Sequence, residues 1–129
     1  MLSRTGVNMG KEAISIAGTK LYGPYTPGVK NGNVIWLSGQ IDVEAGDDIR
    51  SQTAGALAKI DALLEASGVT KHSVCFAQVL LDDINDFAAM NEIYGKWVED
   101  MEVKPARAAF EAGALPAGAK VEIVVQAMA

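Results

Sequence analysis

Apolar positions recur every three or four residues from about Asp47 to Ala66, and this spacing predicts an α-helix. The positions expected to face the core are Ile49, Thr53, Leu57, Ile60 and Leu64. Asp47 or Asp48 can cap the start of this helix, and Gly68 suits its end. A second helix is predicted next, with Asn85 or Asp83 as its cap and with one face formed by Phe87, Met90, Tyr94 and Trp97. Those aromatic side chains are expected to belong to the core.

Short apolar stretches bounded by turn-forming residues predict the strands. They fall at residues 13–16, 20–22, 34–37, 73–81, 106–112 and 120–127. Residues 23–28 are rich in glycine and proline, which predicts a loop, and Asn31-Gly32 is typical of a hairpin turn. The resulting order, β, β, β, α, β, α, β, β, predicts an α+β domain.

The two predicted helices can cover only one face of the sheet. Yet the strands at residues 34–37 and 73–81 are apolar on both alternating sides, so the other face would expose apolar side chains to water. The last strand alternates between Val121, Ile123 and Val125, expected under the helices, and Glu122, Val124 and Gln126. On the preceding strand one side carries Arg107, Ala109 and Glu111. We therefore expect association through a mixed second face, with any site placed between subunits.

Composition narrows the possible functions. A chain of 129 residues, half of them hydrophobic, predicts one globular domain spanning 1–129. The net charge of −5 argues against general binding of nucleic acid or of an anionic membrane. Residues 1–11 lack an apolar signal core and no run is long enough to span a membrane, which predicts a cytoplasmic protein.

The chain has a single cysteine and a single histidine. Cys75 lies in an apolar run, which predicts a buried, inert thiol and excludes an intrachain disulfide. His72 is expected at the surface before a strand. Neither a zinc site nor a Ser-His-Asp triad is predicted, because no second histidine, cysteine cluster or nucleophile-elbow sequence accompanies it.

The best chemical candidates are Arg107, in Lys104-Pro105-Ala106-Arg107, and Glu122, in Val121-Glu122-Ile123. A guanidinium can grip a small carboxylate with two parallel hydrogen bonds, and a glutamate can position or deprotonate a water. The pair therefore suggests a site that holds a small carboxylic acid while water attacks it. The alternative is an ion pair at a subunit interface, from Arg107 to Glu111 or Glu122.

Six short motifs stand in a characteristic order: Gly23-Pro24-Tyr25, Ser38-Gly39-Gln40-Ile41, Asn85-Asp86-Phe87 with Asn91, Lys104-Pro105-Ala106-Arg107, Leu115-Pro116 and Val121-Glu122-Ile123. In this combination the chain resembles the Rid family of reactive intermediate deaminases, also called YjgF or endoribonuclease L-PSP proteins. The resemblance covers nearly the whole chain after the first dozen residues. It implies a chorismate-mutase-like fold, a mixed sheet backed by two helices, and a homotrimer with clefts between subunits.

The resemblance also implies an activity. Active members hydrolyse enamine and imine acids, such as 2-aminoacrylate and 2-aminocrotonate, to 2-keto acids and ammonia, without a metal or an organic cofactor. Such activity would serve metabolite damage control. Alternatives are a non-catalytic module that binds a small carboxylate, or a deaminase of another imine acid of the aminomuconate type. A ribonuclease or translation inhibitor is the weakest reading, because the chain is acidic and lacks basic-aromatic patches.

Individual roles are carried over from the matching motifs. Arg107 matches the arginine that binds the substrate carboxylate, and Glu122 the acid that positions or activates water. Tyr25, Ser38 and Gly39 match residues lining the cleft. Asn91 matches an asparagine near the site. Ala109 stands where many members have cysteine, and its smaller side chain is expected to enlarge the pocket and alter substrate preference.

Overall fold

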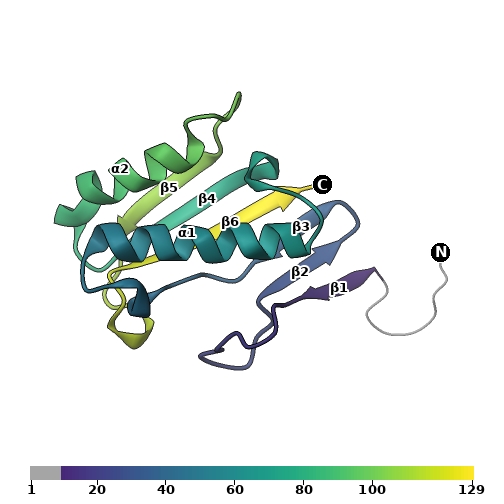
Figure 1. The fold of residues 1–129 in the computed structure, drawn as a ribbon, viewed down its shortest axis with the longest axis horizontal. Coiled ribbons are helices and arrows are strands. Elements are labelled where there is room, and N and C mark those ends of the chain that lie inside the picture. The colour runs from purple at the N-terminus through teal and green to yellow at the C-terminus, as the bar shows by residue number, and fades with distance from the viewer. Residues whose placement is uncertain (1–9) are drawn as a thin grey trace.

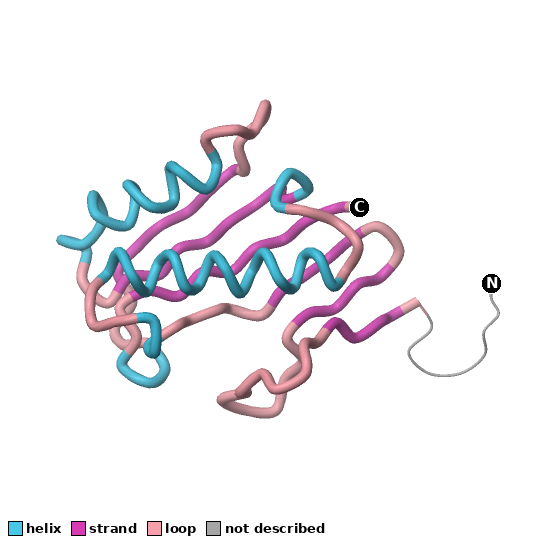
Figure 2. The backbone as a smooth tube through the Cα atoms, in the orientation of Figure 1, coloured by secondary structure: helices cyan, strands magenta, loops and turns pink. Residues whose placement is uncertain are grey.

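The computed structural model describes residues 10–129, which form a six-stranded sheet with two α-helices on one face (Figures 1 and 2). The strands are β1 (Lys11–Ile14), β2 (Gly28–Asn31), β3 (Val34–Leu37), β4 (Val74–Leu81), β5 (Ala106–Glu111) and β6 (Val121–Met128). The helices are α1 (Ile49–Ala66) and α2 (Phe87–Val98). Most of the N-terminal segment for which no signal core is predicted, residues 1–9, lies outside the described residues.

The strand order is β1-β2-β3-β6-β4-β5, so the C-terminal strand lies inside the sheet and β5 forms one edge. All neighbouring strands are antiparallel except β4 and β5, which are parallel. A parallel pair needs a long crossover, and α2 supplies it between these two strands. The mixed sheet expected from the family resemblance is therefore confirmed.

Both helices lie where the apolar spacing predicts, but α2 begins at Phe87 after a 3-10 turn, so its N-cap is Asp86 and not Asn85 or Asp83 as predicted. The Asp48 side chain accepts a hydrogen bond from the Ser51 backbone N–H at 3.0 Å and caps α1. After α1 the chain turns at Gly68, whose φ of +91° favours glycine. The core lies between the helices and the sheet, where Val121, Ile123 and Val125 are fully buried as expected. Phe87 is the exception on α2, because its side chain remains 38% exposed.

The face of the sheet opposite the helices, which we call the open face, is exposed in the single chain. Its strand positions include Trp36, Phe76, Leu80, Phe110, Glu122, Val124, Gln126 and Met128. Trp36 and Phe110 are each 43% exposed and Met128 is 50% exposed. A mixed polar and apolar second face, as predicted, is thus present, and large apolar side chains on one face are typical of an interaction surface.

Three sequence predictions about this scaffold are wrong. The second strand is Gly28–Asn31 and not residues 20–22, which lie in the long loop between β1 and β2 (Figure 2). Gly28 is expected in a loop as a turn former but lies in β2, where its missing side chain allows close packing, since a Cβ there would approach Leu37 Cδ2 to 2.7 Å. Cys75 is exposed and not buried, because a register shift between Val74 and Phe76 takes it out of the alternation.

Candidate functional site

A pocket of about 320 Å³ opens where the loop before β2 meets the end of β3 and the start of β6. Its lining residues are Tyr22, Gly23, Tyr25, Ser38, Gly39, Ile41, Pro116 and Glu122. Four of the predicted site residues therefore gather around one cavity. Sequence reasoning gave Ile41 and Pro116 no role in a site, although both stand in the motifs that carry the family resemblance.

Backbone hydrogen bonds hold the Ser38–Gln40 segment against the rest of the pocket. The Ser38 hydroxyl donates to the Thr26 carbonyl at 2.7 Å, so it can meet a ligand only as an acceptor. Gln40 exchanges two backbone hydrogen bonds with Ile123, at 2.9 and 3.0 Å. This bridge places Gly39 directly beside Glu122 on β6.

Glu122 is the only acid among the described residues that line this pocket, and its carboxylate lies against the backbone of Gly39. Among residues 10–129, none donates a side-chain hydrogen bond to this carboxylate and none forms an ion pair with it. Burial raises the pKa of the Glu122 carboxyl above its ordinary value, because the charged form loses water. A partly buried acid with spare hydrogen-bonding capacity is typical of a proton-transfer group.

Gly39→Ala is expected to displace the Glu122 carboxylate, because an added Cβ would overlap Glu122 Oε2 and approach Cδ to 2.8 Å. Displacing a reacting group by about 1 Å can cost roughly 10²-fold in rate, so we expect a kcat loss of that order for any activity that uses Glu122. Steady-state kinetics measures this loss. Gly113→Ala is the matched control, since nothing lies within 4 Å of that Cβ. Equal kinetics in Gly39→Ala and Gly113→Ala would contradict a catalytic role for the Glu122 carboxylate beside Gly39.

Arg107 lies on the other face of the sheet. In the parallel pairing it stands beside Ala77, which is fully buried on the helix side. Its Nη1 donates to Asn91 Oδ1 on α2 at 2.7 Å. The guanidinium also lies 4.8 Å from the ring centre of Tyr94 and 5.6 Å from that of Phe87, within cation–π range.

The helix spacing of Phe87, Asn91 and Tyr94 is the signal that could have found this cluster, because positions i, i+4 and i+7 share one face. Sequence reasoning placed both aromatics in the core and treated only Asn91 as a site residue. Burial raises the pKa of the Tyr94 hydroxyl, and the positive charge of Arg107 opposes this rise. The Tyr94 hydroxyl is buried without a hydrogen-bond partner among the described residues.

Arg107 forms no ion pair within the described chain, so it pairs with neither Glu111 nor Glu122 there. Glu111 instead accepts a hydrogen bond from the Ile84 backbone N–H at 2.8 Å. The guanidinium is half-buried and keeps N–H groups beyond the one that Asn91 uses. Arg107 therefore retains the capacity for a charge-assisted bond to a carboxylate.

Arg107 and Glu122 do not meet within one chain. Strand β4 separates β5 from β6, and Glu122 stands opposite Leu80 while Arg107 stands opposite Ala77. Since Ala77 and Leu80 point to opposite faces, so do Arg107 and Glu122. The expectation that Arg107 shares the open face is wrong. Ala109 shares the face of Arg107, where it packs partly buried against the core and away from the Glu122 pocket.

No helix within residues 10–129 combines the length and apolarity needed to cross a membrane. Over the same residues, no three histidine, cysteine, aspartate or glutamate side chains gather in a way that could hold a metal ion.

Comparisons with known proteins identify the family of this chain. The family model described as endoribonuclease L-PSP matches residues 17–129. A RutC family protein from Pyrococcus horikoshii is 42% identical over 110 residues, covering 81% of this chain and 86% of its own length. The 2-iminobutanoate/2-iminopropanoate deaminase of Capra hircus is 36% identical over 107 residues, covering 78% of this chain and 77% of its own length.

Solved structures share the fold. The crystal structure of Escherichia coli TdcF with bound serine superposes with a TM-score of 0.85 at 29% identity, covering 92% of this chain and 98% of that one. The match of the family model to most of the chain, and relatives above 30% identity over more than two thirds of it, establish the relationship. This chain therefore belongs to the endoribonuclease L-PSP family, the YjgF or reactive intermediate deaminase proteins, among whose relatives are imine deaminases.

Proposed function

We propose that this protein hydrolyses small imine and enamine acids to 2-keto acids and ammonia, in clefts between subunits of a homotrimer. The observation that carries the proposal is that the two candidate groups lie on opposite faces of the sheet. One face of the sheet offers Arg107 with spare N–H groups, and the other offers a partly buried Glu122 without a partner among the described residues. Association would bring the partner subunit's Arg107 to the Glu122 pocket and complete both half-sites.

The chemistry follows from these groups. A 2-imino acid carries a carboxylate that Arg107 can bind with two parallel hydrogen bonds, which fixes the distance to the imine carbon. One water adds to that carbon, and ammonia leaves, so the C=N bond becomes C=O. An enamine reaches the same imine by tautomerisation. None of these steps needs a redox partner.

Glu122 is proposed to move the protons. Because its pKa is raised, a protonated fraction persists at higher pH than for an ordinary glutamate. The protonated acid can donate to the imine nitrogen, which makes the carbon more electrophilic. The resulting carboxylate can then accept a proton from the attacking water. Tyr25 and Ser38 would line the substrate side of this pocket, with Ser38 acting as an acceptor.

The relatives support the substrate class. The Capra hircus relative is named for 2-iminobutanoate and 2-iminopropanoate, and both are small 2-imino acids. The TdcF structure holds serine, a small molecule with an α-carboxylate. We propose 2-aminoacrylate and 2-aminocrotonate, which tautomerise to these imino acids, as the substrates of this protein.

A coupled assay tests the proposal. A serine or threonine dehydratase generates the enamine in situ, semicarbazide traps the remaining imine, and the rate of keto-acid release is followed with and without this protein. Acceleration with either substrate supports the proposal. A lack of acceleration with both, alongside measurable binding of a small carboxylate, would point instead to a non-catalytic binding module of the same fold.

Trp36→Asp is expected to break the proposed assembly, because it places a charge among the large apolar side chains of the open face. Sedimentation velocity should show a smaller species, and deaminase activity should fall with it. Val103→Asp is the matched control, since Val103 is 79% exposed and lies in the loop between α2 and β5. A Trp36→Asp variant that stays associated and fully active would contradict the open-face interface.

A further inference from the structure

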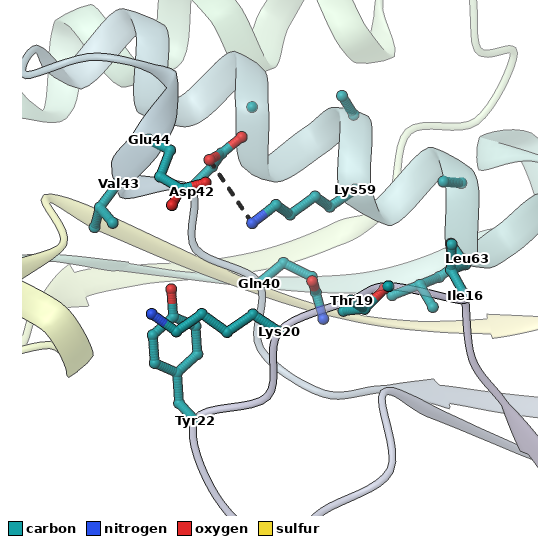
Figure 3. Close-up of a pocket in the computed structure, with 14 residues that line it drawn as sticks. Ile16, Thr19, Lys20, Tyr22, Gln40, Asp42, Val43, Glu44, Lys59 and Leu63 are labelled. Carbon is teal, nitrogen blue, oxygen red and sulfur yellow. Dashed lines mark ion pairs between the residues drawn. The ribbon is translucent and has the colours of Figure 1, made fainter.

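A second and larger cavity lies between the β1–β2 loop and α1 (Figure 3). Its volume is about 430 Å³, a size typical of small-molecule sites. Among the described residues that line the two cavities, only Tyr22 is common to this one and the Glu122 pocket. The proposed deaminase site makes no use of it.

One part of its wall is apolar. Ile16 comes from the loop, and Ala58, Ala62 and Leu63 come from α1. The two alanines are exposed to solvent in the single chain and leave room that longer side chains would fill. A small aliphatic group placed here would bury apolar area at both surfaces.

The other part of the wall carries four charges, and two of them are already used. Lys59 Nζ donates to the Ile41 carbonyl at 2.8 Å and lies 3.7 Å from Asp42 Oδ1. Figure 3 draws this pair as a dashed line, with Lys59 and Asp42 on one side of the gap. The other cation and the other anion of the cavity take no part in this ion pair.

Lys20 and Glu44 are those two charges. Lys20 Nζ lies 5.0 Å from the centre of the Tyr22 ring, and within residues 10–129 no carboxylate comes within 4.0 Å of it. Glu44 likewise has no cation within that distance in the described chain. Figure 3 shows Lys20 with Tyr22 on one side of the gap and Glu44 on the other. A ligand between them would meet one positive and one negative group.

We propose that this cavity binds a small zwitterion with an aliphatic side chain, that is, an α-amino acid. Its carboxylate pairs with Lys20, its ammonium group pairs with Glu44, and its side chain packs on the wall formed by Ala58, Ala62 and Leu63. The net charge of the cavity is zero, with Lys20 and Lys59 against Asp42 and Glu44, so a zwitterion fits better than a simple anion or cation. The binding itself does not depend on the proposed deaminase activity.

Isothermal titration calorimetry of the full chain with L-leucine tests the proposal. We expect saturable binding of L-leucine in the millimolar range. Two probes of the same skeleton separate the charges: 4-methylpentanoate lacks the ammonium group, and 3-methylbutylamine lacks the carboxylate. Each is expected to bind roughly 10-fold more weakly or worse, since each loses one charge-assisted contact.

Variants locate the site. Lys20→Met and Glu44→Gln are each expected to weaken leucine binding about 10-fold or more. Ala58→Leu should abolish binding by filling the cavity, whereas Ala54→Leu, the same change on an exposed part of α1 outside the cavity, should not. Arg107→Ala and Glu122→Gln should bind leucine as the wild type does, because neither residue is among the described residues that line this cavity.

Three results would overturn the proposal. The first is an absence of saturable leucine binding in the millimolar range. The second is equal affinity for 4-methylpentanoate, which would make the ligand a plain carboxylate. The third is loss of leucine binding in Arg107→Ala or Glu122→Gln with retention in Lys20→Met, which would place the amino acid in the Glu122 pocket.

Discussion

Replacing Glu122 with glutamine is expected to lower kcat for imine hydrolysis by roughly 10²–10⁴-fold, the usual contribution of a general acid–base group. The amide is close in shape to the carboxyl group, so it should keep the packing against Gly39. It cannot, however, accept a proton from water or donate one as an acid. Binding of the substrate carboxylate, which rests on Arg107, should change little. Steady-state kinetics in the coupled assay measures both effects.

Glu122→Gln should also make the fold more stable than the wild type, and this advantage should grow as pH rises. Burial raises the folded-state pKa of Glu122, so the folded protein binds this proton more tightly than the unfolded chain does. Stability from this group is present below the unfolded pKa and is lost as pH rises through the folded pKa. Glutamine lacks this titration. The difference in unfolding free energy between Glu122→Gln and wild type should therefore grow in favour of the variant from acid to neutral pH.

Glu102→Gln is the matched control, because Glu102 is an exposed residue in the loop between α2 and β5. Glu102→Gln removes one negative charge without changing the Glu122 pocket. Comparing the two variants therefore separates the effect of Glu122 from the effect of net charge. Denaturant unfolding at several pH values gives the comparison. Normal turnover in Glu122→Gln would refute its acid–base role, and an unchanged pH dependence of stability would refute its desolvation.

Arg107→Ala is expected to reduce kcat/KM by roughly 10²-fold, because it removes charge-assisted bonds to the substrate carboxylate. Arg107→Lys keeps the charge but loses the planar fork, so it should recover only part of the loss. Arg50→Ala is the control, since Arg50 pairs with Glu92 on the exposed helix surface. Kinetics with a neutral ester of the substrate class should be insensitive to Arg107.

Mixing two impaired variants tests whether the site is shared between subunits. If Arg107 of one subunit serves the Glu122 pocket of another, unfolding and refolding Arg107→Ala together with Glu122→Gln creates some sites with both groups intact. In a random trimer with equal amounts, about a quarter of the wild-type activity should return. Each variant refolded alone should keep only its low residual activity. If the mixture also keeps only residual activity although mass spectrometry shows mixed trimers, the intersubunit arrangement is wrong.

Local patterns were sufficient for much of the fold. The period of apolar residues located α1, and Asp48 and Gly68 marked its ends, because helix formation and capping depend on near neighbours in the sequence. Apolar runs located β3, β4 and β6 for a similar reason. The residue types needed for the proposed chemistry, Arg107 and Glu122, were also evident from short motifs.

The sequence by itself thus determined the helices, the central strands and the identity of the candidate groups. Only the tertiary structure decided how these groups are arranged. Strand β4 lies between β5 and β6, and this non-local pairing puts Arg107 under α2 and Glu122 on the open face. Likewise, the closeness of Gly39 to Glu122 follows from the bridge between Gln40 and Ile123, which are far apart in sequence. Strand order and such bridges depend on packing of the whole chain, which no local pattern contains.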